Sequence, residues 1–180
     1  MVMSSTMKQM PETVVHNPLG LSKDTVAPIV KDLNQDLATT YTFYHQIKKH
    51  HWVVEGPEYM PLHKFLDDWA AALLKQADAL AERITALGGY PVSGPVAQQT
   101  LSLIEVEPEG VFSLRAMLEK DLNDGTEIAV SLREHIVRAV TAGDFGTEQL
   151  VKEILLEHEG MVHHLEHFLG SESLAKELFK

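Results

Sequence analysis

Apolar residues recur along most of the chain at intervals of three and four, the spacing that places side chains on one face of an α-helix. Four long segments carry this pattern. They span residues 22–54, 58–87, 111–141 and a last segment that begins at 144 or 147 and ends at 169. No segment alternates polar and apolar residues in the way that is typical of a β-strand. The hydrophobic pattern therefore predicts an all-α protein.

Turn-forming residues separate the predicted helices. Ser22 can cap the first helix, and Gly88 and Gly89 form a common stop signal at the end of the second. The connection at 90–110 is rich in Pro and Gly but contains a short helical patch at 96–104. Because this connection can cross the length of a bundle, we predict a ferritin-like four-helix bundle with a short extra helix between its second and third helices.

The composition limits the class of protein. The 180 residues suffice for one domain with a sizeable core, and 44% hydrophobic and 23% charged residues are ordinary for a globular protein. The absence of cysteine excludes thiolate metal sites, disulfides and thiol catalysis. No apolar run reaches the roughly 20 residues of a membrane span, and the N-terminus lacks a secretory pattern. We therefore expect a cytoplasmic protein without membrane contact.

Two short segments lie outside the predicted bundle. We expect a flexible N-terminal arm at 1–21, the bundle at 22–169 and a C-terminal tail at 170–180. The formal net charge of −11 disfavours a general attraction to nucleic acid, which is held mainly by Lys and Arg contacts to phosphates. The same charge favours cations as partners.

A second stripe on the second predicted helix consists almost wholly of metal-ligand residue types. Its members are His63, Asp67, Leu74, Asp78 and Glu82. Their spacings of four, seven, four and four place them on one side of the helix. Such stripes are most often solvated polar faces, but this one contains neither Lys nor Arg. The composition of the stripe therefore also indicates a metal site.

His51 strengthens the metal interpretation, because it falls at the centre of the apolar stripe of the first helix. A lone core histidine is usually structural. His63, however, follows twelve residues later, and the loop EGPEYMP between them allows the chain to reverse. The two imidazoles can then face each other across the helix pair, which is a suitable start for a metal site.

The length of the second helix decides how such a site can close. His63 and Asp78 are fifteen residues apart, about 22 Å along a helix, and Glu82 lies about 28 Å from His63. Because metal–ligand bonds are about 2 Å long, one copy of the helix cannot close the site. Two antiparallel copies related by a twofold axis can. No Glu in the chain is followed by His three residues later, so the usual di-iron motif within one bundle is absent.

The same region resembles the Dps family, the ferritin-like mini-ferritins of bacteria and archaea. The stretch KKHHWVVEGPEYMPLHKFLDDWAAALLKQADALAERITALGG has the His-Trp pair at His51 and the Leu-His pair at His63 with Asp67 four residues on. Asp-x-x-Ala-Glu-Arg then follows from Asp78 to Arg83, before a closing Leu-Gly-Gly. The signature is long and specific, and the four-helix layout extends the resemblance over about residues 22–169.

The resemblance implies a hollow homododecamer with di-iron ferroxidase sites at its twofold interfaces. Each site would take His51, His63 and Asp67 from one subunit and Asp78 and Glu82 from its partner. Fe²⁺ would be oxidised there, preferably by hydrogen peroxide rather than oxygen, and stored as a ferric mineral. This removes the reagents of hydroxyl-radical formation. Imidazole and carboxylate ligands also suit zinc, so a zinc-occupied, metal-buffering shell is an alternative.

Several further residues are candidates near the site or on the iron path. Trp52 beside the site is either packing or a radical sink. His158 lies in the apolar stripe of the last helix and is either a hydrogen-bonded core histidine or an outer partner of the metal ligands. His164 lies at the edge of that stripe, where it can approach the metal, whereas His163 and His167 point outward.

The N-terminal arm bears on DNA binding, and the start of the last predicted helix bears on iron entry. Many members of the family bind DNA through a lysine-rich arm, but here residues 1–21 contain only Lys8, which argues against DNA binding. A DNA-binding, chromosome-protecting role is nevertheless kept as an alternative. Asp144 and Glu148 begin the last helix, where acids stabilise a helix N-terminus. In the family this region lines threefold pores for iron entry, and the two roles are compatible.

Overall fold

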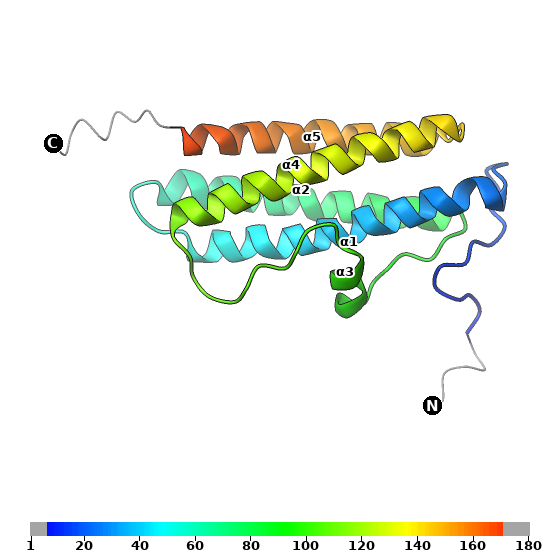
Figure 1. Cartoon of the computed structure of the whole chain (residues 1–180), viewed down its shortest axis with the longest axis horizontal. Helices are drawn as coiled ribbons and strands as arrows, with labels where there is room; N and C mark the ends of the chain where they lie inside the picture. The colour runs from blue at the N-terminus through cyan, green and yellow to red at the C-terminus, as the bar shows by residue number, and fades with distance from the viewer. Residues whose placement is uncertain (1–6, 171–180) are drawn as a thin grey trace.

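The computed structural model describes residues 7–170, and over that range the chain forms five helices and no strand (Figure 1). The helices are α1 Lys23–Val53, α2 Tyr59–Ala86, α3 Pro95–Leu101, α4 Leu114–Thr141 and α5 Phe145–Leu169. The predicted all-α fold and the short extra helix in the long connection are confirmed. None of these helices is long and apolar enough to cross a membrane.

The four long helices form two hairpins that pack on each other. α1 packs along α2, and α4 packs along α5. The connection that carries α3 runs from the end of α2 back along the bundle to the start of α4, so that α2 and α4 point in the same direction (Figure 1). α3 packs against α1. This long crossover distinguishes a ferritin-like bundle from a simple up-and-down bundle.

Polar side chains cap three of the helices. The hydroxyl of Ser22 accepts the amide hydrogen of Thr25 at 3.1 Å, and the hydroxyl of Ser113 accepts that of Ala116 at 3.3 Å. Asp144 caps α5 in the same way. Each cap satisfies one of the free amide groups at a helix start, a contribution of about 1 kcal/mol. These caps explain why the predicted helix starts agree with the observed ones to within a few residues.

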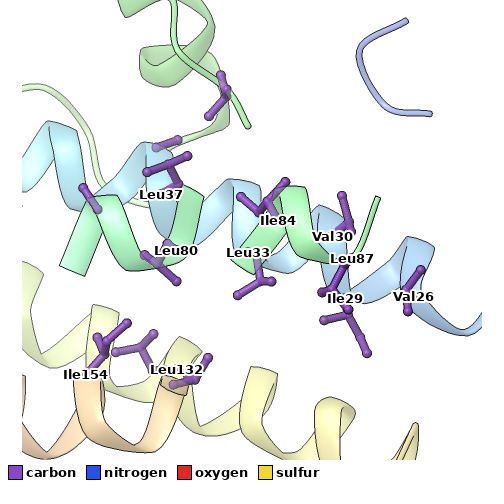
Figure 2. Packing of buried hydrophobic residues seen from close by; sticks show 14 of the residues in the cluster. Val26, Ile29, Val30, Leu33, Leu37, Leu80, Ile84, Leu87, Leu132 and Ile154 are labelled. Carbon is purple, nitrogen blue, oxygen red and sulfur yellow. The ribbon is translucent and has the colours of Figure 1, made fainter. Parts of the chain in front are cut away.

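The core between the two hairpins consists of two clusters of buried apolar side chains. Figure 2 shows part of the first cluster, in which Leu33 of α1 and Leu80 of α2 face Leu132 of α4 and Ile154 of α5. The second cluster lies toward the α1–α2 loop and includes Phe43, Trp69 and Leu165. Fully burying a side chain of this size contributes about 1.5–3 kcal/mol. The core therefore holds α1 and α2 rigidly at the end of the bundle where His51 lies.

Residues 7–22 contain no helix before α1 begins, but they contact the bundle. The amide of Val15 donates to the carbonyl of Gly88 at 2.8 Å, and the side chain of Asn17 is buried. Gly88 has a φ of +82°, and a Cβ there would lie 2.4 Å from the Val15 carbonyl oxygen, so only glycine fits. Residues 1–6 of the predicted arm and 171–180 of the predicted tail lie outside the described residues.

Candidate metal centre

His51 and His63 form the centre of the candidate site. The loop between α1 and α2 reverses the chain, and the two rings stack with their centroids 3.8 Å apart. Nδ1 of His51 lies 2.8 Å from the carbonyl oxygen of His63, and Nδ1 of His63 lies 2.9 Å from that of His51. A carbonyl only accepts, so each Nδ1 donates its hydrogen, and Nε2 is the nitrogen of each ring that can offer a lone pair to a metal. This arrangement orients a histidine for metal binding through Nε2.

Asp67 lies one turn beyond His63 on α2 and adds a carboxylate to the same place. Its Oδ1 is 3.8 Å from Nε2 of His51, and it accepts a hydrogen bond from the ammonium of Lys48. This bond to Lys48 holds the pKa of the Asp67 carboxyl below its usual value. The carboxylate is therefore charged, and it is exposed, so a cation can reach it.

Asp78 and Glu82 are not brought to this group within one chain. Both are exposed on the same unbroken helix, and the rise of about 1.5 Å per residue places Asp78 about 22 Å from His63. Among the described residues, no three or more His, Asp or Glu side chains come together as a metal site. One chain therefore presents two separate groups, His51–His63–Asp67 and Asp78–Glu82, with the exposed Leu74 between them on the stripe.

Trp52 and His158 lie in opposite surroundings. Trp52, next to His51, is 69% exposed and lines a surface hollow of about 450 Å³ between α1, α3 and the loop that follows. His158 is fully buried, and its Nε2 donates to the carbonyl of Gly125 at 2.8 Å. Burial lowers the pKa of His158, so the ring is neutral. Its contacts are those of a hydrogen-bonded core histidine.

His164 is exposed on α5, near the end of the bundle where the site lies. Its ring packs edge-on against Phe65 of α2, with the ring centroids 6.4 Å apart. Phe65 lies between His63 and Asp67 in sequence but on another face of α2, because neighbouring residues are turned by about 100°. The structure thus places His164 beside the α2 segment that carries the site, against Phe65.

Asp144 and Glu148 begin α5 with helix-stabilising contacts. The buried carboxylate of Asp144 accepts the amide hydrogen of Thr147 at 3.0 Å and also binds the guanidinium of Arg83 on α2. Glu148 pairs with Lys152 one turn on. These bonds tie the start of α5 to the end of α2. The carboxylate of Asp144 is therefore engaged within its own chain.

Two buried histidine–carboxylate groups between α1 and α4 were not predicted. Nδ1 and Nε2 of His50 lie 2.7 Å from Asp121 and 3.0 Å from Glu107. Burial acts to lower the pKa of His50, but the bonds to Asp121 and Glu107 raise it above the usual value, which favours the protonated ring. Burial also raises the pKa of the Asp121 carboxyl, and the bond to His50 opposes this. At the other end of the seam, Nδ1 of His135 binds both oxygens of Asp36 at 2.8 and 2.9 Å.

A sequence signal for these groups did exist. Asp36 and Asp121 occupy positions on the apolar sides of their helices, where an unpaired carboxylate costs several kcal/mol, and each has a histidine available on the opposite helix. Buried acids within an apolar stripe indicate a partner of opposite charge.

Comparisons with known proteins agree with the fold. Residues 30–175 match the model of the ferritin-like domain. A protein of Halobacterium salinarum named "DNA protection during starvation protein" is 41% identical over 156 residues, covering 87% of this chain and 86% of that protein. These similarities extend over nearly all of the helical region.

Solved structures resemble this one closely. The crystal structure of an archaeal Dps homologue from Halobacterium salinarum aligns with a TM-score of 0.91 at 38% identity, over 94% of both chains. A Dps protein of Vibrio cholerae O1, described as a member of a broad superfamily of ferritin-like diiron-carboxylate proteins, aligns with a TM-score of 0.80 over 90% of this chain and 99% of that chain. At 24% identity this second similarity concerns the fold alone.

Proposed function

Because this chain belongs to the Dps family of ferritin-like proteins, we propose that it oxidises Fe²⁺ at sites shared by two subunits and stores the ferric product inside a hollow dodecamer. The observation that carries the proposal is the His51–His63 pair. Both Nδ1 atoms are bonded to backbone carbonyls, so both Nε2 atoms are free for a metal beside the charged carboxylate of Asp67.

A twofold axis completes the site. The midpoint between His63 and Glu82, and that between Asp67 and Asp78, both fall between residues 72 and 73. An axis through this point aligns two antiparallel α2 helices, so that His63 and Asp67 of one helix lie opposite Glu82 and Asp78 of the other. Leu74, which is 43% exposed, then lies near the axis and is covered by the partner. The dimer gains two equal sites and buries an apolar side chain.

Iron is the substrate in this proposal. Imidazole and carboxylate ligands suit Fe²⁺, and membership of the ferritin-like Dps family supports this choice over the zinc that the same ligands also accept. Two ferrous ions each give one electron to one hydrogen peroxide, whose O–O bond breaks. The oxygens take up two protons and leave as two waters. The ferric ions then hydrolyse, release protons and collect as mineral in the cavity.

Protection of DNA follows from this chemistry without contact with DNA. The Halobacterium relative is named for DNA protection. The oxidation consumes both Fe²⁺ and peroxide, which together form hydroxyl radicals. The net charge of −11 disfavours binding to the phosphates of DNA. A gel-shift titration at low salt tests this: retardation of DNA at micromolar protein would favour a direct DNA-binding role.

Mixed subunits test the shared site. His63→Ala and Glu82→Ala subunits are each expected to be inactive in stopped-flow oxidation of Fe²⁺ by peroxide. When equal amounts are unfolded and refolded together, half of the dimers are mixed, and each mixed dimer has one intact and one doubly damaged site. The mixture should therefore regain about one quarter of the wild-type sites.

A matched mixture provides the control. His63→Ala and Asp67→Ala damage the same half of the site, so every site in a mixed dimer contains one of them. This mixture should regain no activity. Recovery in both mixtures, or in neither despite correct assembly, would contradict the shared site. Repeating the oxidation with oxygen in place of peroxide determines which oxidant is preferred.

A further inference from the structure

A second imidazole pair lies on the surface of α5. His163 and His167 are one helical turn apart, and both are exposed. Their Nε2 atoms lie 3.3 Å from each other, with ring centroids 4.5 Å apart. Residues at i and i+4 are neighbours on a helix surface, so the backbone itself holds these two nitrogens together.

The separation of the two nitrogens matches the bite of a metal ion. Zn–N bonds are about 2.05 Å long, and two such bonds that meet at the tetrahedral angle of about 109° place their nitrogens about 3.3 Å apart. The observed 3.3 Å therefore fits a metal ion held by both rings without rearrangement of the helix. The same geometry also fits a hydrogen bond between the two rings, in which one Nε2 donates and the other accepts.

We propose that His163 and His167 form a surface chelate for a late divalent transition metal of the Zn²⁺ or Cu²⁺ class. Imidazole ligands suit these ions, and affinity rises along the series toward Cu²⁺. Water completes the coordination, since no third His, Asp or Glu among the described residues joins the pair. Glu166 lies 4.0 Å from Nδ1 of His163, where its carboxylate can accept the Nδ1 hydrogen once Nε2 binds the metal.

The chelate is separate from the candidate ferroxidase site. His163 and His167 contact each other on the outer surface of α5, whereas their neighbour His164 packs toward α2. The proposal requires neither a second subunit nor iron oxidation. An acidic chain with a net charge of −11 also raises the local concentration of divalent cations.

Metal titration of the full-length, chelator-stripped protein tests the proposal. Isothermal titration with Zn²⁺ counts the sites per chain in wild type, His163→Ala, His167→Ala and the double variant. Alanine is the best helix former, so α5 stays folded in all of them. Each single variant should lose one site per chain, with affinity there falling on the order of a hundredfold, since even outer partners of metal ligands contribute tenfold to a hundredfold.

The double variant distinguishes a chelate from two independent histidines. A chelate is already broken by the first change, so the double variant should bind the same number of ions as each single variant. The two-nitrogen Cu²⁺ resonance signal that this pair adds should be missing in His163→Ala, whereas a His16→Ala control, which removes a different exposed histidine, should retain it. Unchanged Zn²⁺ stoichiometry in the single variants, or loss of two sites in the double variant, would overturn the proposal. Slower Fe²⁺ oxidation in these variants would overturn the separation from the ferroxidase site.

Discussion

His50 and His51 are adjacent in sequence, yet their rings have opposite environments. His50 is fully buried, and carboxylates face both of its nitrogens. His51 is also largely buried, but only its Nδ1 is bonded, to the carbonyl of His63, while its Nε2 faces the exposed Asp67. The first ring is held by a carboxylate at each nitrogen, whereas the second has its Nε2 directed at an exposed carboxylate.

The difference separates histidines that can bind a metal from histidines that cannot. A ring whose two nitrogens both donate to carboxylates has no lone pair left, so it binds helices together and cannot bind a metal. A ring whose Nδ1 donates to a carbonyl is fixed in the tautomer that a metal requires. His135 resembles His50 in that its Nδ1 binds a buried carboxylate, that of Asp36, while its Nε2 lies 3.4 Å from the hydroxyl of Ser131. His63 resembles His51.

The largest effect is expected from His50→Ala. It leaves the fully buried Asp121 without its cationic partner, and breaking a buried ion pair costs about 3–5 kcal/mol. Urea unfolding at one fixed protein concentration measures this, because assembly also contributes to stability. The rate of Fe²⁺ oxidation by the protein that remains assembled should not change.

A matched variant checks the cause. His50→Leu with Asp121→Leu replaces both partners by apolar residues, and such replacement is often neutral. It should therefore be much more stable than His50→Ala. A loss below about 1 kcal/mol in His50→Ala, within the range of an exposed pair, would show that His50 and Asp121 do not form a charged pair.

His51→Ala should give the converse result. Loss of one imidazole ligand should slow Fe²⁺ oxidation about a hundredfold or more, equivalent to about 2.7 kcal/mol of activation free energy. Stability should fall less than in His50→Ala, because no buried charge is left unpaired. Stopped-flow oxidation and urea unfolding of the two neighbouring variants measure both quantities. If His51→Ala oxidised iron at the wild-type rate, the assignment of His51 as a ligand would be wrong.

The pH dependence of stability should come from the structural pairs. Burial lowers the pKa of His50 and of His135, but the bonds to their carboxylate partners have the larger combined effect. Both histidines therefore have a pKa above the usual value. Their stabilising contribution is complete below the unfolded pKa of about 6.5 and is lost as pH rises through the higher folded value. Each tenfold gain in proton affinity corresponds to about 1.4 kcal/mol. The free energy of unfolding should therefore fall above about pH 6.5.

His135→Gln provides the control for this pH effect. It removes one of the two rings that release a proton as the pH rises, so the slope should become shallower. His158 acts in the opposite sense, because burial lowers its pKa and its contribution is lost as pH falls. A slope that His135→Gln leaves unchanged would assign the pH dependence to other groups.

The sequence predicted the helices well because each one is amphipathic and has a local stop or start signal. Ser22 and Asp144 cap their helices as expected, and the second helix ends just before Gly88-Gly89. Each of these signals involves only a few neighbouring residues, so it can be recognised from the sequence alone. The His51–His63 pair was also predictable, because a short loop leaves the chain few ways to reverse.

The contacts between distant segments were less predictable. The bond between Nδ1 of His51 and the His63 carbonyl depends on the register of α1 against α2, which the core decides. The pairing of His50 with Asp121 joins residues 71 apart, and nothing local in either helix specifies it. The proximity of the His163 and His167 nitrogens, by contrast, follows from their i, i+4 spacing on an exposed face of the last helix.

The smallest effect is expected from a change at Lys48, the cation that pairs with Asp67. A metal ion and this ammonium compete for the same carboxylate, so Lys48→Met should tighten binding of a divalent cation several-fold and leave stability almost unchanged. Titration with Zn²⁺, which is not oxidised, separates binding from catalysis.

Higher salt weakens the exposed Lys48–Asp67 pair, so the advantage of the variant should shrink as ionic strength rises. Lys64→Met, one turn from the site but paired with Asp68, is the matched control and should bind as wild type does. Equal affinity in Lys48→Met and wild type would mean that the bond between Asp67 and Lys48 does not compete with metal binding. The exposed Asp67 and the buried Asp121 would then differ in exposure alone, and not in how easily each carboxylate exchanges its partner.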